Sequence, residues 1–246
     1  MSEARARRLR PVVAIDGPAG AGKSTVTKRV ADRLGYTRVD TGALYRAVAF
    51  ACQEQGVDWA DAAGTGEVAS RLAAPGALSL STSGPDTKVE IHGRDVSGAI
   101  RTLEMGQGAS IVSAHEPVRA ALLEIQRELG RAGGVVLEGR DIGSVVFPDA
   151  EAKFYLTASV EVRAERRRLE LSAKGTAPPI EQVLSEVLER DRRDSTRPVA
   201  PLVQAVDALL VDSSGQTVDE VVETIVREVE HIARQLAQHE RVGRKQ

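Results

Sequence analysis

Eight consecutive residues near the amino terminus have the types and spacing of a phosphate-binding loop. Residues 17–24 are Gly-Pro-Ala-Gly-Ala-Gly-Lys-Ser and match the pattern G-x-x-x-x-G-K-[ST] in full. The glycines let backbone N–H groups turn toward phosphate oxygens. The lysine reaches the β- and γ-phosphates, and the serine hydroxyl can ligate Mg²⁺. We therefore expect ATP or GTP to bind here with Mg²⁺, with Ser24 as metal ligand. The expected contacts are Gly17, Pro18, Ala19, Gly20, Ala21, Gly22, Lys23, Ser24 and Thr25.

Three further segments combine arginines with hydroxyls and carboxylates. They are Asp40–Arg46, Glu138–Asp141 and Arg190–Arg197. Arginine keeps its charge and grips phosphate bidentately, so a cluster of arginines can hold a phosphorylated acceptor against a nucleotide. An acceptor oxygen that is already anionic needs no general base, and catalysis then consists of positioning and charge stabilisation. Taken alone, the mixed-charge run at Arg190–Arg197 is more typical of a solvated helix face.

A phosphate loop is compatible with a GTPase switch, an ATPase that works on nucleic acid, or a small-molecule kinase. The GTPase interpretation needs an Asn-Lys-x-Asp element, and the chain contains no asparagine. The nucleic-acid interpretation predicts a basic or aromatic-lined groove. The net charge is −2 and aromatic residues make up only 3%. The composition therefore favours a kinase for a phosphorylated small molecule.

The segments that must position these residues alternate between short apolar runs and helical patterns. Apolar spacing of three or four residues predicts helices after the phosphate loop, over Gly42–Gln55, around Val118–Leu129 and beyond Val218. Strands are expected at Val12–Ile15, Thr37–Asp40, Val135–Leu137, Phe154–Leu156 and Ala208–Val211. The alternation predicts an α/β fold with a five-stranded parallel sheet flanked by helices. Ligands collect at the carboxyl ends of such strands.

Between residues 62 and 101 this pattern changes. Leu78–Ser81 and Lys88–His92 alternate in polarity, with a turn signal at Ser83–Asp86 between them. We interpret residues 62–101 as a small β-rich insertion. Later in the chain, Val160–Leu171 and Ile180–Arg193 are predicted as two charged helices.

Length and composition bound the remaining possibilities. The chain has 246 residues, of which 42% are hydrophobic and 28% charged, as expected for one globular domain. No run approaches the length of a membrane span, and Met1–Arg10 lacks the apolar core of a secretory signal. Cys52 is the only cysteine, so a reducing cytoplasm is the expected compartment. We expect a tail over residues 1–10 and a single domain over 11–240.

Several motifs together resemble the bacterial-type cytidylate kinases. The resemblance runs from about residue 11 to about residue 212, and the motifs keep their order along it. They are Ile15–Thr25, Asp40–Arg46, Asp95–Ser97 before Ile100–Thr102, Gly139–Gly143, Val145–Ala150, Arg190–Arg197 and Ala200–Leu202. Ala19 and Thr41 stand where some relatives carry serine.

The resemblance implies phosphoryl transfer from ATP to CMP or dCMP, with a kinase for UMP or dTMP as the alternative. It implies a three-layer P-loop kinase fold, an acceptor-binding subdomain at about 62–101, a lid at about 160–178 and a monomer. Lys23, Arg140, Arg190 and Arg197 are then the expected catalytic residues, and Arg166 is the lid arginine expected at ATP. The expected acceptor contacts are Thr41, Tyr45, Arg46, Ser110, Arg119, Arg140, Asp141, Asp194 and Arg197. Among these, Ser110, Arg119 and Asp141 would read the cytosine edge, and Asp194 would hold the sugar.

Overall fold

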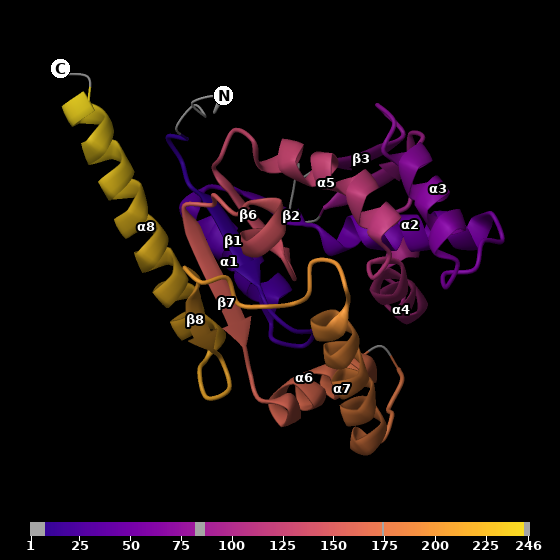
Figure 1. The fold of residues 1–246 in the computed structure, drawn as a ribbon. Coiled ribbons are helices and arrows are strands. Elements are labelled where there is room, and N and C mark those ends of the chain that lie inside the picture. Colours follow the sequence, from indigo (N-terminus) through magenta and orange to yellow (C-terminus); the bar gives the residue numbers. More distant parts are fainter. Residues whose placement is uncertain (1–7, 82–86, 174, 244–246) are drawn as a thin grey trace.

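The computed structural model describes residues 8–81, 87–173 and 175–243, and its centre is a five-stranded sheet (Figure 1). The strand order is β2-β6-β1-β7-β8, and every pair is parallel. The strands are β1 (Val12–Asp16), β2 (Thr37–Asp40), β6 (Val135–Gly139), β7 (Ala152–Thr157) and β8 (Leu209–Asp212). All five lie where the sequence predicts strands, which confirms the expected fold class.

The register of the three central strands brings the functional segments to one edge. Asp16, the last residue of β1, pairs with Gly139 at the end of β6 and with Tyr155 in β7. The phosphate loop therefore leaves the sheet beside the segment that carries Arg140 and Asp141. This edge is where ligands collect in open α/β sheets.

Helices cover both faces of the sheet because its strands are apolar on both sides. From β1, Val13 and Ile15 pack in one core cluster with residues of α1 (Lys23–Leu34) and α8 (Val218–Gly243). Val12 and Ala14 belong to a second cluster with α5 (Glu116–Gly130) and the short π-helical turn η2 (Ile142–Val146). The result is the three-layer arrangement visible in Figure 1.

A second group of helices lies beside the sheet and carries a small antiparallel sheet. The helices are α2 (Gly42–Glu54), α3 (Ala62–Leu72) and α4 (Leu103–Val112), and they share a core with α5. The small sheet has the order β3-β4-β5, and its strands are β3 (Leu78–Ser81), β4 (Lys88–Ile91) and β5 (Arg94–Asp95), followed by the turn η1 (Ala99–Arg101).

The predicted β-rich segment 62–101 is thus only partly β-structure. Its strands β3 and β4 form as expected, but its first eleven residues form α3. Asp61 caps this helix by accepting hydrogen bonds from the N–H groups of Ala63 and Gly64. The two glycines in α3 weaken its local helix propensity, and burial of Val68 and Leu72 outweighs that effect. The turn predicted at Ser83–Asp86 lies outside the described residues.

Two helices form a separate pair, α6 (Val160–Ala173) and α7 (Ile180–Thr196), and the lid predicted at about 160–178 includes α6 and ends before α7. They pack through a small cluster of Ala164, Leu171, Val183 and Val187. Figure 1 shows the pair projecting from the carboxyl end of β7, away from α8. In the described ranges, no helix combines the length and apolar character that crossing a membrane requires.

The predicted tail 1–10 is described only from Arg8 onward, and there the structure differs from a solvated tail. The Arg8 guanidinium lies 3.0 Å from Asp149 Oδ2 and 3.2 Å from Glu151 Oε1. The Arg10 guanidinium lies 4.4 Å from the ring centroid of Tyr36. These partners are far away in the sequence, so no local pattern indicates them.

Candidate active site

The phosphate loop connects β1 to α1, and two of its glycines are required by space and backbone angle. Gly17 has a φ of 150°, and a Cβ there would lie 1.9 Å from the carbonyl oxygen of Leu156. Gly20 has a φ of 77°, and a Cβ there would meet Arg163 at 3.0 Å. Any other residue would be strained at these positions. The loop therefore has the close-packed backbone that a phosphate cradle requires.

Lys23 opens α1 and is buried inside the loop. Its ammonium donates hydrogen bonds of 2.7 Å to the carbonyl oxygens of Gly17 and Pro18. Burial lowers the pKa of Lys23 well below its usual value, and the charge of Arg140 lowers it further. Because burial is the main cause of this low pKa, an anionic ligand beside Lys23 would stabilise its charged form.

Ser24, the expected metal ligand, contacts a carboxylate that the sequence-based prediction missed. Its hydroxyl donates a 2.7 Å hydrogen bond to Glu138 Oε2, and Glu138 also accepts one of 2.8 Å from Arg38. Burial raises the pKa of Glu138, and the charge of Asp40 raises it further. An acidic residue at the end of the strand beside the phosphate loop is the signal that could have identified it.

These oxygen donors fit Mg²⁺. A serine hydroxyl beside a carboxylate supplies the hard ligands that this ion prefers. In the described part of the chain, no group of three or more His, Cys, Asp or Glu residues could enclose a metal ion. Mg²⁺ commonly completes its shell with substrate phosphates and water.

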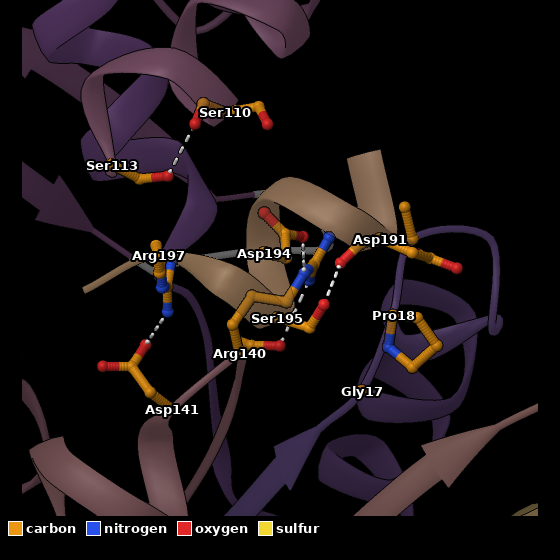
Figure 2. Close-up of polar contacts among 12 residues, drawn as sticks. Gly17, Pro18, Ser110, Ser113, Arg140, Asp141, Asp191, Asp194, Ser195 and Arg197 are labelled. Carbon is orange, nitrogen blue, oxygen red and sulfur yellow. Dashed lines mark hydrogen bonds and ion pairs between the residues drawn. The ribbon is translucent and has the colours of Figure 1, made fainter. Parts of the chain in front are cut away.

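The acceptor-side arginines are held by buried carboxylates (Figure 2). Arg140 Nε lies 2.8 Å from Asp194 Oδ2, and Arg197 Nη2 lies 3.3 Å from Asp141 Oδ1. Arg119 forms an ion pair with the second oxygen of Asp141. Burial acts to raise the pKa of Asp194, but the charges of Arg140 and Arg190 outweigh it and lower the pKa. We call Arg119, Arg140, Asp141, Asp194 and Arg197 the acceptor cluster.

Residues from the start of α2 lie beside the acceptor cluster. The buried Thr41 hydroxyl donates a 2.8 Å hydrogen bond to the carbonyl oxygen of Glu138, and Arg46 pairs with Asp40 at 2.6 Å. The Tyr45 ring centroid lies 5.6 Å from the Arg119 guanidinium. This cation–π contact orients Arg119.

Two serines near the end of α4 add polar groups to the same region. The Ser113 hydroxyl donates a 3.2 Å hydrogen bond to the carbonyl oxygen of Ser110 (Figure 2). The Ser110 hydroxyl is buried and has no hydrogen-bond partner among the described residues. Buried polar groups in proteins are normally paired, so a ligand is the natural partner for this hydroxyl.

The loop and the acceptor cluster line one cavity of about 310 Å³. The predicted site residues in its wall are Ala19, Gly20, Gly22, Lys23, Ser24, Thr25, Thr41, Tyr45, Arg46, Ser110, Arg119, Arg140, Asp141, Arg190, Asp194 and Arg197. The wall also contains residues not predicted, including Glu138, Ser113, Arg167 and Glu170. Gly17, Pro18, Ala21 and Arg166 lie outside it. The structure thus places donor-side and acceptor-side groups around a common space.

The arginines of α6 and α7 have different environments. Arg190 lines the cavity, and burial together with the charge of Arg140 lowers its pKa to about 10. Arg163 pairs with Asp191 at 2.7 Å. Arg166 donates to the carbonyl oxygens of Ser213 and Ala21, at 2.8 and 3.4 Å.

Of the consecutive arginines 166–168 in α6, the one that lines the cavity is Arg167, one residue beyond Arg166. Arg167 also pairs with Glu170 along its own helix, at 3.1 Å, and Arg168 pairs with Glu165 in the same way, at 2.6 Å. Neighbouring positions on a helix point about 100° apart, so choosing among consecutive arginines requires the helix orientation.

Comparison with known proteins gives a consistent set of relatives. The family model described as cytidylate kinase matches residues 13–231. A cytidylate kinase of Geobacter sp. (strain M21) is 51% identical over 218 residues, covering 89% of this chain and 92% of the relative. Those of Citrifermentans bemidjiense and Shouchella clausii are 50% and 47% identical, covering 86% and 91% of this chain and 89% and 97% of the relatives.

Proposed function

The chain belongs to the cytidylate kinase family, and from this premise we propose that it transfers the γ-phosphoryl group of ATP to CMP or dCMP. The products are ADP and CDP or dCDP. A phosphate oxygen of the acceptor forms the new bond, and the bond between the γ-phosphorus and the β,γ-bridging oxygen breaks. The proposal rests on one observation, which is that residues of the phosphate loop and of the acceptor cluster line the same cavity.

On the donor side, we assign the ATP phosphates to the backbone of residues 17–25 and to Lys23. Mg²⁺, when bound, would neutralise charge on the β- and γ-phosphates, and Ser24 would hold it with Glu138 close by. Arg190 lines the same cavity as the loop and the acceptor cluster, and its charge acts on both Lys23 and Asp194, so we assign it to the transferring phosphoryl group. Charge stabilisation of this kind needs no proton transfer.

On the acceptor side, Thr41, Arg46, Arg140 and Arg197 would bind the phosphate of the nucleoside monophosphate. Asp194 would accept a hydrogen bond from a sugar hydroxyl while it holds Arg140. Ser110, Arg119 and Asp141 would read the base, with Tyr45 packed beside it. The arginine charges offset the repulsion between two anionic substrates.

The proposed base contacts explain a preference for cytosine over uracil. Cytosine presents an exocyclic amino donor, and each Asp141 oxygen has a lone pair left after pairing with its arginine. Uracil presents a carbonyl at that position, which would set acceptor against acceptor. A buried mismatch of this kind costs about 1–3 kcal/mol, which corresponds to a preference of about 5- to 150-fold.

The helix pair α6–α7 would act as a lid that closes over ATP and excludes water, with Arg167 reaching the cavity. Cleavage near residues 174–175 by a protease should slow when a bisubstrate analogue is added. Unchanged cleavage would indicate a rigid segment. We further propose a cytoplasmic monomer that binds nucleotides and not nucleic acid, in keeping with the net charge of −2.

The direct test is the initial rate of ADP release with ATP and Mg²⁺ against CMP, dCMP, UMP, AMP, GMP and dTMP. We expect CMP and dCMP to be clearly preferred. Activity on UMP or dTMP alone would keep the kinase chemistry and reject the cytosine contacts. A protein that binds ATP but phosphorylates none of the six would contradict the proposal.

A further inference from the structure

Asp16 is a buried carboxylate that the sequence analysis assigns to no role. It ends β1, directly before the first glycine of the phosphate loop, and is 5% exposed. Its Oδ1 accepts a 2.8 Å hydrogen bond from the N–H of Ile142, and its Oδ2 accepts one of 2.7 Å from the N–H of Gly143. One side chain thus connects the strand before the donor loop to the segment after Asp141.

The two N–H groups open the π-helical turn η2. Within this turn, Val145 and Val146 donate to the carbonyl oxygen of Asp141, at 2.9 and 3.1 Å. The first N–H groups of any helical segment lack acceptors in that segment. Asp16 supplies the missing acceptors from a different strand, so it caps η2 from outside.

The cap fixes the backbone of two acceptor-cluster residues. Arg140 and Asp141 lie between the end of β6 and the start of η2, so this short connection is held at both ends. Gly143 leaves room for an ordinary contact with Asp16, because a Cβ there would lie 3.5 Å from Asp16 Oδ2.

We propose that Asp16 is a positioning residue for the nucleoside monophosphate: it touches no substrate, but it holds the backbone that presents Arg140 and Asp141 to the acceptor. The proposal rests on the proposed function and adds a residue to its acceptor side. It also predicts that losing this cap affects the acceptor far more than ATP, although Asp16 adjoins the donor loop.

Asp16 is a carboxylic acid in a place where burial disfavours its charged form. Its presence there is explained by the hydrogen bonds that it accepts from the backbone. Burial raises the pKa of Asp16 to about 6, although the N–H groups of Gly143 and Ile142 act to lower it. The charge of Asp141 raises the pKa and that of Lys23 lowers it. An apolar residue at this position would leave two buried N–H groups without acceptors.

The test is Asp16→Asn, which keeps the shape but replaces one acceptor oxygen with an NH₂ group facing a backbone N–H. We expect the KM for CMP to rise about tenfold, with the KM for ATP within about twofold of the wild-type value. Glu151→Gln is the matched control, because Glu151 accepts a 2.8 Å hydrogen bond from the N–H of Val12 at the opposite end of β1. We expect this control to leave both KM values unchanged.

A second variant, Asp16→Glu, keeps both acceptor oxygens but moves them by one methylene group away from the two N–H groups, so it should also raise the KM for CMP. It decides the matter if Asp16→Asn does not fold. A folded variant with an unchanged KM for CMP, or with equal increases for both substrates, would overturn the positioning role. Wild-type activity on CMP is measured first, so failure of the proposed function is distinguished from failure of this inference.

Discussion

The phosphate loop is one run of eight residues held by its backbone, whereas the acceptor cluster draws paired side chains from α5, the end of β6 and the end of α7. In the loop, Gly17 and Gly20 take backbone angles that suit glycine. In the cluster, Arg140 is held by Asp194, and Asp141 holds Arg119 and Arg197. Changing one loop residue removes one group that acts on a phosphate, while changing one cluster residue leaves another buried charge unpaired.

The largest effect on rate should come from Lys23→Met. This substitution removes the ammonium group that we assign to the ATP phosphates, and we expect kcat to fall on the order of 10²- to 10³-fold. Because Lys23 bonds only to carbonyl oxygens of its own loop among the contacts described, the melting temperature should change little. Lys28→Met, in the same helix, should leave kcat unchanged. A kcat for Lys23→Met within tenfold of the wild-type value would contradict the assignment.

The largest effect on stability should come from the acceptor cluster, through Asp194→Asn. Breaking the buried pair with Arg140 should lower the free energy of unfolding by about 3 kcal/mol at pH 7. The folded-state pKa of Asp194 is lowered, so its contribution is complete above the unfolded value of 3.8 and is lost as the pH falls through the folded pKa.

Urea unfolding at several pH values tests this prediction. The difference between wild type and Asp194→Asn should stay constant from about pH 7 to about pH 5 and narrow only below about pH 4. A difference that disappears between pH 7 and pH 5 would show that another group is responsible.

A smaller effect, on the KM for ATP, should distinguish the neighbouring arginines Arg166 and Arg167 of α6. Arg167 lines the cavity, so Arg167→Ala should raise the KM for ATP about tenfold, with little change in melting temperature. Arg166 instead binds carbonyl oxygens of Ala21 and Ser213, so Arg166→Ala should mainly lower the melting temperature. The reverse pattern would support Arg166, the residue predicted from the sequence, as the arginine that contacts ATP.

The smallest effect is expected at an exposed ion pair of α7. Arg192 pairs with Glu189 at 2.8 Å along the helix surface, where solvent screens the interaction. Arg192→Ala should change neither the melting temperature nor the KM for CMP measurably. A clear rise in the KM for CMP would show that the acceptor cluster extends farther along α7 than its buried pairs indicate.

The same contrast explains how much the sequence could predict. The phosphate loop and the five parallel strands follow from local patterns, because glycine spacing and short apolar runs each specify a local conformation. The two charged helices α6 and α7 also follow from local spacing. All nine predicted acceptor residues line the cavity. Seven of them lie in the three arginine-containing segments that stand out in the sequence, whereas Ser110 and Arg119 were indicated by the family resemblance alone.

Other features depend on contacts between distant residues. Glu138 belongs to the site because β6 pairs with β1 in the sheet. Asp16 caps η2 because the first N–H groups of that turn lie within hydrogen-bond distance of its carboxylate. The helix α3 forms despite two glycines because its apolar face is buried against α5 and α2. Only the orientation of α6 about its own axis determines that Arg167, and not Arg166, lines the cavity.

The most direct test of the acceptor side is the ratio of kcat/KM for CMP to that for UMP, in wild type and in Asp141→Ala. The ratio is taken within one protein preparation, so it does not depend on the fraction that is folded. We predict a strong wild-type preference for CMP that falls at least tenfold in the variant, while the KM for ATP stays within about twofold. An unchanged ratio, or equal losses for CMP and ATP, would contradict the account.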